Sequence, residues 1–298
     1  MMTRISLTDD LDLSRIVYGL WRLTEDPDHS SAHAQAKIEA CLEQGITTLD
    51  QADIYGAYGC EAALGEVLRD AAHLRDQVEI VTKCGIVAPM GRYEHAHVKH
   101  YDTSAAHIRQ SVDASLRLMR TDRIDLLLIH RPDPFMNAEE TGAALDALVR
   151  SGDVRAVGVS NFRPHDMELL SAFMSEPLVT NQIELSLMAR DPFTHGDLAY
   201  LQQRSIAPMA WSPLGGGALF GTDNSALLGR LGELAAASDT DMAAIAVAWL
   251  LAHPARIMPV LGTNRLSRIQ TISDATKVEM DRERWFELYT LARGEEVA

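Results

Sequence analysis

Short apolar runs alternate with longer amphipathic stretches along the whole chain. Several of these runs, such as 126–129, are apolar at every position. Continuous apolar runs of this length are typical of parallel strands that are buried on both faces. The pattern therefore predicts eight parallel strands, at 15–21, 46–50, 78–83, 124–130, 154–160, 179–184, 206–212 and 257–262.

Between the strands, apolar residues recur every three or four positions, as an amphipathic helix requires. The spacing is clearest at Ile108, Val112, Leu116 and Met119, and it repeats at Thr141, Leu145 and Leu148. The run 243–252 predicts a buried helix that ends before Pro254, and 281–292 predicts a closing helix.

A strand followed by a helix, eight times without a flexible linker, predicts a single (β/α)8 TIM barrel of the α/β class that spans 1–298. The rival is a doubly wound open sheet. That fold normally places a G-x-G-x-x-G fingerprint after its first strand, and the residues from Gly19 onward do not supply one. The longest polar insertion, 90–102, predicts a loop over one mouth of the barrel.

Composition narrows the function classes. The 298 residues are 47% hydrophobic and 23% charged, which is typical of a folded globular chain and excludes disorder. Acidic residues outnumber basic ones by 42 to 27, so the net charge of −15 disfavours nucleic acids and anionic membranes. Three cysteines outside any metal-ligand spacing predict a reducing compartment without disulfides or structural zinc. With no signal peptide and no long apolar run, we expect a cytoplasmic protein.

Polar residues stand at the end of nearly every predicted strand. In a (β/α)8 barrel these ends meet at one face, so residues distant in sequence converge there. We therefore expect one cavity lined by Asp50, Lys83, His130, Ser160, Asn161, Asn181, Gln182, Ser212, Gly262 and Thr263. Tyr55 follows Asp50 by five residues, close enough for a short loop to bring its phenol back over the cavity.

These residue types suit the reduction of a carbonyl group. An ammonium at Lys83 stabilises a phenolate, so it should lower the pKa of Tyr55 and make this residue a useful acid. Asp50 can supply the counter-charge of the lysine, and His130 can donate a hydrogen bond to a carbonyl oxygen. None of the four donates hydride, so a cofactor must. The amides of Asn161 and Gln182 are suitable partners for a nicotinamide carboxamide.

The chain resembles the aldo/keto reductase superfamily over nearly its whole length, within it a bacterial branch whose fourth strand ends in HRPDP. The matching stretches, in order, are LDQADIYG, VTKCG, DLLLIHRPD, GVSNF, NQIELS, MAWSPLGGG and PVLGTNRLSR. The resemblance implies an NADPH-dependent reductase of aldehydes or ketones. It also implies that Tyr55 is the general acid, that Lys83 and Asp50 tune it, and that His130 orients the carbonyl.

The resemblance further implies how the cofactor NADPH is held. Trp211 would lie against the nicotinamide, 212–217 along the pyrophosphate, and Thr263 and Arg268 at the 2′-phosphate. Trp21 would form a wall of the substrate pocket beside Tyr55 and His130. The full set of expected cofactor-binding residues is Gly19, Leu20, Asp50, Ser160, Asn161, Gln182, Trp211, Ser212, Pro213, Leu214, Gly215, Gly217, Gly262, Thr263, Asn264 and Arg268.

Simpler alternatives exist for most of these residues. Asp50 and Lys83 could be a structural ion pair, the glycine run a simple turn, Thr263 a cap and Arg268 a solvated charge. The histidines of 95–100 lack the spacing of a metal site, so we expect none. Alternatives to the enzyme are a nucleotide-binding regulatory module with slow turnover and a metal-assisted hydrolase. The identity of the carbonyl substrate and the oligomeric state stay open.

Overall fold

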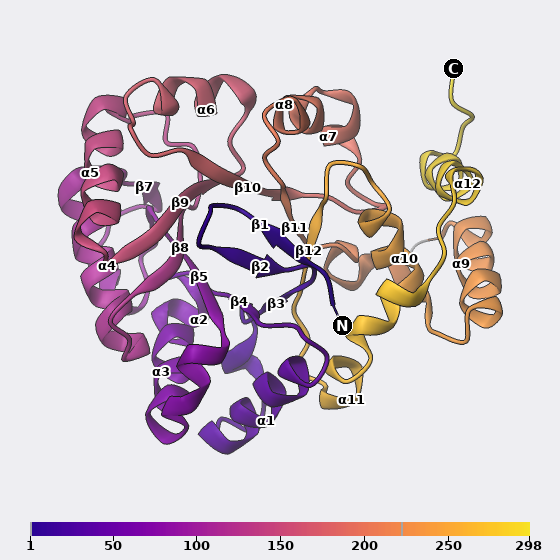
Figure 1. Cartoon of the computed structure of the whole chain (residues 1–298), viewed down its shortest axis with the longest axis horizontal. Helices are drawn as coiled ribbons and strands as arrows, with labels where there is room; N and C mark the ends of the chain where they lie inside the picture. Colours follow the sequence, from indigo (N-terminus) through magenta and orange to yellow (C-terminus); the bar gives the residue numbers. More distant parts are fainter. Residues whose placement is uncertain (1, 222) are drawn as a thin grey trace.

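Eight parallel strands close into a barrel in the computed structural model, which describes residues 2–221 and 223–298 (Figure 1). Their order around the barrel is β10-β11-β12-β3-β4-β5-β8-β9, and β9 pairs with β10 to complete the circle. The predicted TIM barrel and all eight predicted strands are confirmed. The strands are β3 (Val17–Gly19), β4 (Thr48–Asp50), β5 (Glu79–Cys84), β8 (Ile124–Ile129), β9 (Val154–Ser160), β10 (Leu178–Glu184), β11 (Met209–Trp211) and β12 (Met258–Leu261).

Helices surround the barrel (Figure 1). The main ones are α1 (Ser31–Leu42), α3 (Cys60–Asp70), α4 (Ala105–Met119), α5 (Ala138–Ser151), α6 (Pro164–Ser171), α8 (Asp197–Gln203), α9 (Ser225–Ala237), α10 (Met242–Leu251) and α12 (Arg282–Arg293). Shorter ones are α2 (Tyr55–Tyr58), α7 (Asp191–Thr194) and α11 (Leu266–Ile269). The four helices predicted from apolar spacing correspond to α4, α5, α10 and α12. In the described residues no single helix is long and apolar enough to cross a membrane; α9 and α10 reach that length only together, bent by 92°.

A hairpin closes one end of the barrel and was not predicted. It is formed by β1 (Arg4–Ser6) and β2 (Asp12–Ser14), which pair antiparallel. Leu11 and Leu13 of the hairpin are buried against Val17, Val81 and other residues that fill the barrel interior. The hairpin covers the end at which the strands begin, so the opposite end is the one open to ligands.

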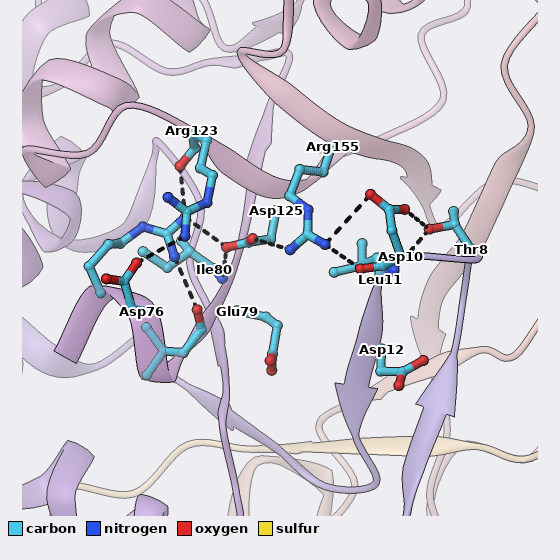
Figure 2. A network of polar contacts seen from close by, with 12 residues as sticks. Thr8, Asp10, Leu11, Asp12, Asp76, Glu79, Ile80, Arg123, Asp125 and Arg155 are labelled. Atoms are coloured by element: carbon cyan, nitrogen blue, oxygen red, sulfur yellow. Dashed lines mark hydrogen bonds and ion pairs between the residues drawn. The ribbon is translucent and has the colours of Figure 1, made fainter. Parts of the chain in front are cut away.

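Polar contacts fasten this hairpin to the barrel (Figure 2). Asp125, which is 1% exposed, accepts hydrogen bonds from Arg75 Nη2 at 2.8 Å, Arg155 Nη1 at 2.9 Å and the Ile80 amide at 2.8 Å. Arg155 also donates to the backbone carbonyl of Asp10 in the hairpin. One buried carboxylate therefore joins two strands and the hairpin at the closed end.

The polar insertion at 90–102 is more ordered than the loop that we expected. It begins with a 3-10 turn at Gly91–Tyr93, and its end forms β7 (His100–Tyr101), which pairs antiparallel with β6 (Ile86–Val87). Two-residue strands leave no periodic signal in a sequence. The pairing fixes both ends of the insertion just beyond β5, which ends at the open mouth.

Candidate active site

The Lys83 amine is the centre of the polar cluster at the open end. Its Nζ donates to both carboxylate oxygens of Asp50 and to the Gln51 carbonyl, each at 2.8 Å, and lies 3.0 Å from the Tyr55 hydroxyl. Lys83 is 0% exposed and Asp50 2%. Burial alone would lower the pKa of Lys83, but Asp50 and Tyr55 together outweigh it through charge and hydrogen bonds, so the pKa is raised. The lysine therefore stays a cation.

Tyr55 is the first residue of α2, which follows β4 after a short loop. Burial raises the pKa of its phenol, while the charge of Lys83 acts in the opposite direction. The expected lowering of this pKa is wrong for the free protein, because desolvation of the phenolate exceeds the attraction of an ammonium that Asp50 already neutralises. Tyr55 is therefore a protonated phenol, ready to donate.

His130 follows β8 and faces Tyr55, with the ring centroids 5.9 Å apart and the planes at 78°. Burial lowers the pKa of the imidazole well below its usual value, and the charges of Lys83, Arg131 and Lys99 add to the shift. The ring is therefore neutral at neutral pH, with one N–H donor and one acceptor nitrogen. Its Nδ1 is buried and has no hydrogen-bond partner among the described residues.

Side chains on β9 and β10 support this cluster. The side-chain Nε2 of Gln182 donates to Asp50 Oδ1 at 2.7 Å, and the backbone carbonyl of Gln182 accepts from the Ser160 hydroxyl at 2.9 Å. Asn161 Nδ2 donates to Ser160 Oγ at 2.8 Å, and Asn161 Oδ1 accepts from Trp211 Nε1 at 2.9 Å. The expected convergence of strand ends is thus observed from β4 to β11.

Asn181 is the exception and does not face the cavity. Successive side chains of a strand point to opposite faces, so Asn181 and Gln182 cannot both point into the mouth. Asn181 Nδ2 donates instead to the Phe162 carbonyl at 2.8 Å, with Met167 Sδ at 3.6 Å. The expectation that both amides line one cavity is wrong for Asn181.

Two glycines allow close packing at the seam between β3 and β12. A Cβ on Gly19 would lie 3.0 Å from Val260 Cγ1, and one on Gly262 would lie 3.2 Å from the Gly19 carbonyl. Next to the seam, Leu20 is buried, and its amide donates to the Asp50 carbonyl at 2.9 Å. Glycine at these two positions therefore lets the ends of β3 and β12 approach each other closely beside Asp50.

The segment 212–217 begins after β11 and has an unusual backbone. Ser212, Gly215, Gly216 and Gly217 all have positive φ, at 49°, 60°, 64° and 102°. The amides of Gly215 and Gly217 donate within the segment, to Ser212 and Leu214. In this conformation both amides are already used in hydrogen bonds within turns. A pyrophosphate would therefore have to bind other groups of the segment.

The residues expected at the 2′-phosphate lie beyond β12. The Tyr18 hydroxyl donates to the Thr263 carbonyl at 3.0 Å, which fixes the start of this loop. Asn264 is held by Lys37, which donates to its Oδ1 at 3.2 Å, and by its own bond to the Arg22 carbonyl at 2.6 Å. Its amide thus anchors the loop, whereas Arg268 on α11 is exposed and has no side-chain partner among the described residues.

Sequence analysis did not single out two cations at the mouth. The Arg131 guanidinium lies 5.8 Å from the centroid of the Trp211 ring, and both Arg131 and Lys99 act on the pKa of His130. Arg131 directly follows His130 in the sequence, so its position just after a strand could have been used to predict it at the mouth. Trp21, expected as a pocket wall, is 52% exposed beside Arg22.

Comparison with known proteins shows the family to which the chain belongs. The profile of the Aldo/keto reductase family matches residues 15–292, and the chain belongs to this family. It is 65% identical to the 6-dehydroglucose reductase of Agrobacterium fabrum over the full length of both chains. It is 39% identical to the enzyme of the same name from Novosphingobium aromaticivorans, over 95% of this chain and 93% of that one. A thermostable aldo-keto reductase solved with the inhibitor epalrestat superposes with a TM-score of 0.83, at 26% identity, and covers 97% of this chain and 100% of its own.

Family membership makes the chain an oxidoreductase that depends on a nicotinamide cofactor. The half-buried indole of Trp211, at the end of β11, fits the flat ring of such a group. Asn161 Oδ1 has a second lone pair besides the one used by Trp211, which a carboxamide N–H can occupy. The residues present thus fit the group that the family implies.

Proposed function

We propose that this chain reduces an aldehyde or ketone to an alcohol with NADPH, and that Tyr55 is the general acid. The observation that carries the proposal is the Tyr55 hydroxyl, 3.0 Å from a buried lysine that Asp50 holds charged. A protonated phenol beside a fixed ammonium can lose its proton to a substrate and be stabilised as a phenolate.

In the proposed reaction the carbonyl oxygen lies between the Tyr55 hydroxyl and His130. When bound, the nicotinamide supplies the hydride that none of these side chains can provide. As the π bond of the carbonyl breaks, its oxygen takes the Tyr55 proton, and Lys83 stabilises the phenolate that is left. The neutral His130 donates a hydrogen bond to the same oxygen, which favours the charge that develops there.

Residues on five strands would hold the cofactor. Trp211 would cover one face of the nicotinamide, and Ser160, Asn161 and Gln182 would bind its carboxamide. Segment 212–217 would lie along the pyrophosphate, with Gly19, Leu20 and Gly262 beside the ring. These roles follow the family, and what supports them is that the residues lie at or just beyond the last residues of β3, β9, β10, β11 and β12.

Preference for NADPH over NADH is proposed from charge at the far end of this cleft. Arg268 is exposed on α11, Thr263 lies just before it, and the hydrogen bond from Asn264 brings Arg22 next to this loop. A guanidinium binds phosphate through charge-assisted hydrogen bonds. In a chain of net charge −15, a local group of arginines favours an anion at this place.

The substrate that we propose is 6-dehydroglucose or a closely related polyhydroxylated aldehyde. Two relatives with this activity in their names match nearly the whole chain, one of them at 65% identity. The pocket rim combines indole and guanidinium groups at Trp211 and Arg131, which suits a substrate that carries many hydroxyl groups. The alternative of a regulatory module with slow turnover is not favoured, because these relatives are named as reductases.

The test is to follow oxidation of NADPH spectroscopically with 6-dehydroglucose, simple aldehydes, ketones and quinones, and to repeat the panel with NADH. The proposal predicts the highest kcat/KM for 6-dehydroglucose with NADPH. A higher kcat/KM for quinones would contradict the substrate assignment, and oxidation of neither nucleotide with any carbonyl compound would contradict the proposed activity.

A further inference from the structure

The backbone directly after Tyr55 has an unusual conformation. Gly56, Ala57 and Tyr58 all have positive φ, at 58°, 52° and 70°. Residues with a Cβ rarely adopt this region, and two in succession persist only where the surroundings hold them. The position of the Tyr55 hydroxyl therefore depends on whatever holds this turn.

Arg92 contacts the chain on both sides of Tyr55. Its Nη2 donates to Asp53 Oδ2 at 2.9 Å, two residues before Tyr55. Its guanidinium carbon lies 5.0 Å from the ring centroid of Tyr58, three residues after Tyr55. The Asp53 amide, in turn, donates to the Lys83 carbonyl at 3.0 Å. One side chain thus bridges the two ends of the segment that carries the proposed acid.

The rest of the insertion packs on the same turn. A Cβ on Gly91 would lie 2.3 Å from the Ala57 carbonyl, so the 3-10 turn at Gly91–Tyr93 approaches the strained backbone directly. The Tyr93 ring lies 5.1 Å from the Tyr58 ring at 69°. The Tyr58 hydroxyl donates to the Ile86 carbonyl and accepts from the Ala88 amide, both at 3.1 Å.

The Asp53 carboxyl is held by the Arg92 guanidinium. The Asp53 side chain is 0% exposed, against 25% for Arg92, and its Oδ1 has no hydrogen-bond partner among the described residues. Burial and the nearby buried Glu61 raise the pKa of Asp53 to about 8, although Arg92 acts in the opposite direction, so the acid is largely protonated at neutral pH. Without Arg92, this segment would contain a buried carboxyl next to Tyr55 that has lost its side-chain hydrogen bond.

We infer that Arg92 is a positioning residue, which fixes the Tyr55 hydroxyl opposite Lys83 by bridging Asp53 and Tyr58. The inference rests on the proposed role of Tyr55 as the acid. Arg92 also joins two parts of the site, because it belongs to the insertion at the barrel mouth, whereas Tyr55 follows β4. The position of the acid then depends on a folded insertion.

The first test compares Arg92→Met with Arg109→Met in kcat, in KM and in NADPH affinity measured by fluorescence. Arg109 is the matched control, a half-exposed arginine of α4 that pairs with Asp113 and Asp153. We expect Arg92→Met to lower kcat by roughly 10- to 100-fold, because a small misplacement of a reacting group has effects of this size. Its affinity for NADPH should stay as in the parent, since the expected cofactor residues lie on other segments. Arg109→Met should change neither kcat nor the affinity for NADPH.

A second variant separates positioning from stability. Arg92→Met leaves the buried Asp53 carboxyl without its side-chain hydrogen-bond partner, which should lower the Tm. Adding Asp53→Leu replaces that carboxyl by an apolar group of the same shape, so the double variant should recover much of the Tm while kcat stays low. Recovery of both would show that Arg92 only satisfies the Asp53 carboxyl and would overturn the inference. If Arg92→Met does not fold, the double variant alone decides between these outcomes.

Tyr55→Phe, measured in parallel, distinguishes failure of the inference from failure of the proposed function. If Tyr55→Phe keeps its kcat, Tyr55 is not the acid and the proposed function fails. If Tyr55→Phe loses activity while Arg92→Met and the double variant both keep theirs, only the positioning role of Arg92 is wrong.

Discussion

His130 shows how much the surroundings of one residue decide its chemistry. Sequence analysis expected His130 to donate a hydrogen bond to a carbonyl oxygen. In the structure, burial and the cations Lys83, Arg131 and Lys99 keep it neutral, so it can donate a hydrogen bond without competing with Tyr55 as a proton source. The same burial keeps Tyr55 protonated, which the charge of Lys83 alone would not predict.

The depressed pKa of His130 predicts a dependence of stability on pH. The unfolded chain binds a proton at His130 below pH 6.5, whereas the folded chain does so only at much lower pH. Stability should therefore be complete above pH 6.5 and fall as the pH drops below it. Thermal unfolding of the parent and of His130→Asn, measured from neutral to acidic pH, should show a smaller decrease in Tm for the variant. Equal decreases would mean that His130 does not contribute.

Among the helices and strands, the sequence predicted those that carry a periodic or continuous apolar signal. All eight barrel strands were found because each contains or adjoins a short apolar run, which is clearest at 126–129 in β8. Helix α1 was not named, since the buried Lys37 interrupts its apolar side, and β1, β2, β6 and β7 are too short to show a period. The bridge from Arg92 to Asp53 was not predictable either, because the conformation of an insertion follows from tertiary contacts.

The loop between β12 and α11 carries a prediction about the nucleotide. Arg268→Ala should weaken NADPH binding by about 10-fold or more and leave NADH binding nearly unchanged, because each charge-assisted hydrogen bond to the 2′-phosphate contributes about 1.5–3 kcal/mol. Titration of both nucleotides by fluorescence or calorimetry measures this. Arg284→Ala, at an exposed arginine of α12, is the control. Equal weakening of NADPH and NADH would show that Arg268 is structural.

The two ends of the barrel differ in what their residues do. The end where the strands begin is closed by the hairpin and the contacts of Asp125, while the end where they finish carries the polar cluster. This division is typical of TIM barrels, in which residues at one face serve stability and those at the other serve catalysis. It explains why strand ends could be read from the sequence as candidate site residues.

This division predicts that stability and activity can be separated. Asp125→Ala leaves Arg75 and Arg155 without their buried partner and should lower the free energy of unfolding by about 3–5 kcal/mol. At temperatures below its lowered Tm, the Asp125→Ala protein should have the same kcat and KM as the parent. Asp122→Ala removes an exposed carboxylate and is the control. Denaturant unfolding with steady-state kinetics tests both points, and a large loss of kcat in folded Asp125→Ala would contradict the division.

The rate constant of Tyr55→Phe decides whether Tyr55 protonates the carbonyl oxygen. The variant removes one hydroxyl and should retain its fold and its affinity for NADPH. Proton donation by a positioned side chain contributes about 10²- to 10⁴-fold in rate, so kcat for a good aldehyde should fall by a factor in this range. A folded Tyr55→Phe protein that binds NADPH and keeps most of the parent kcat would show that Tyr55 is not the proton donor.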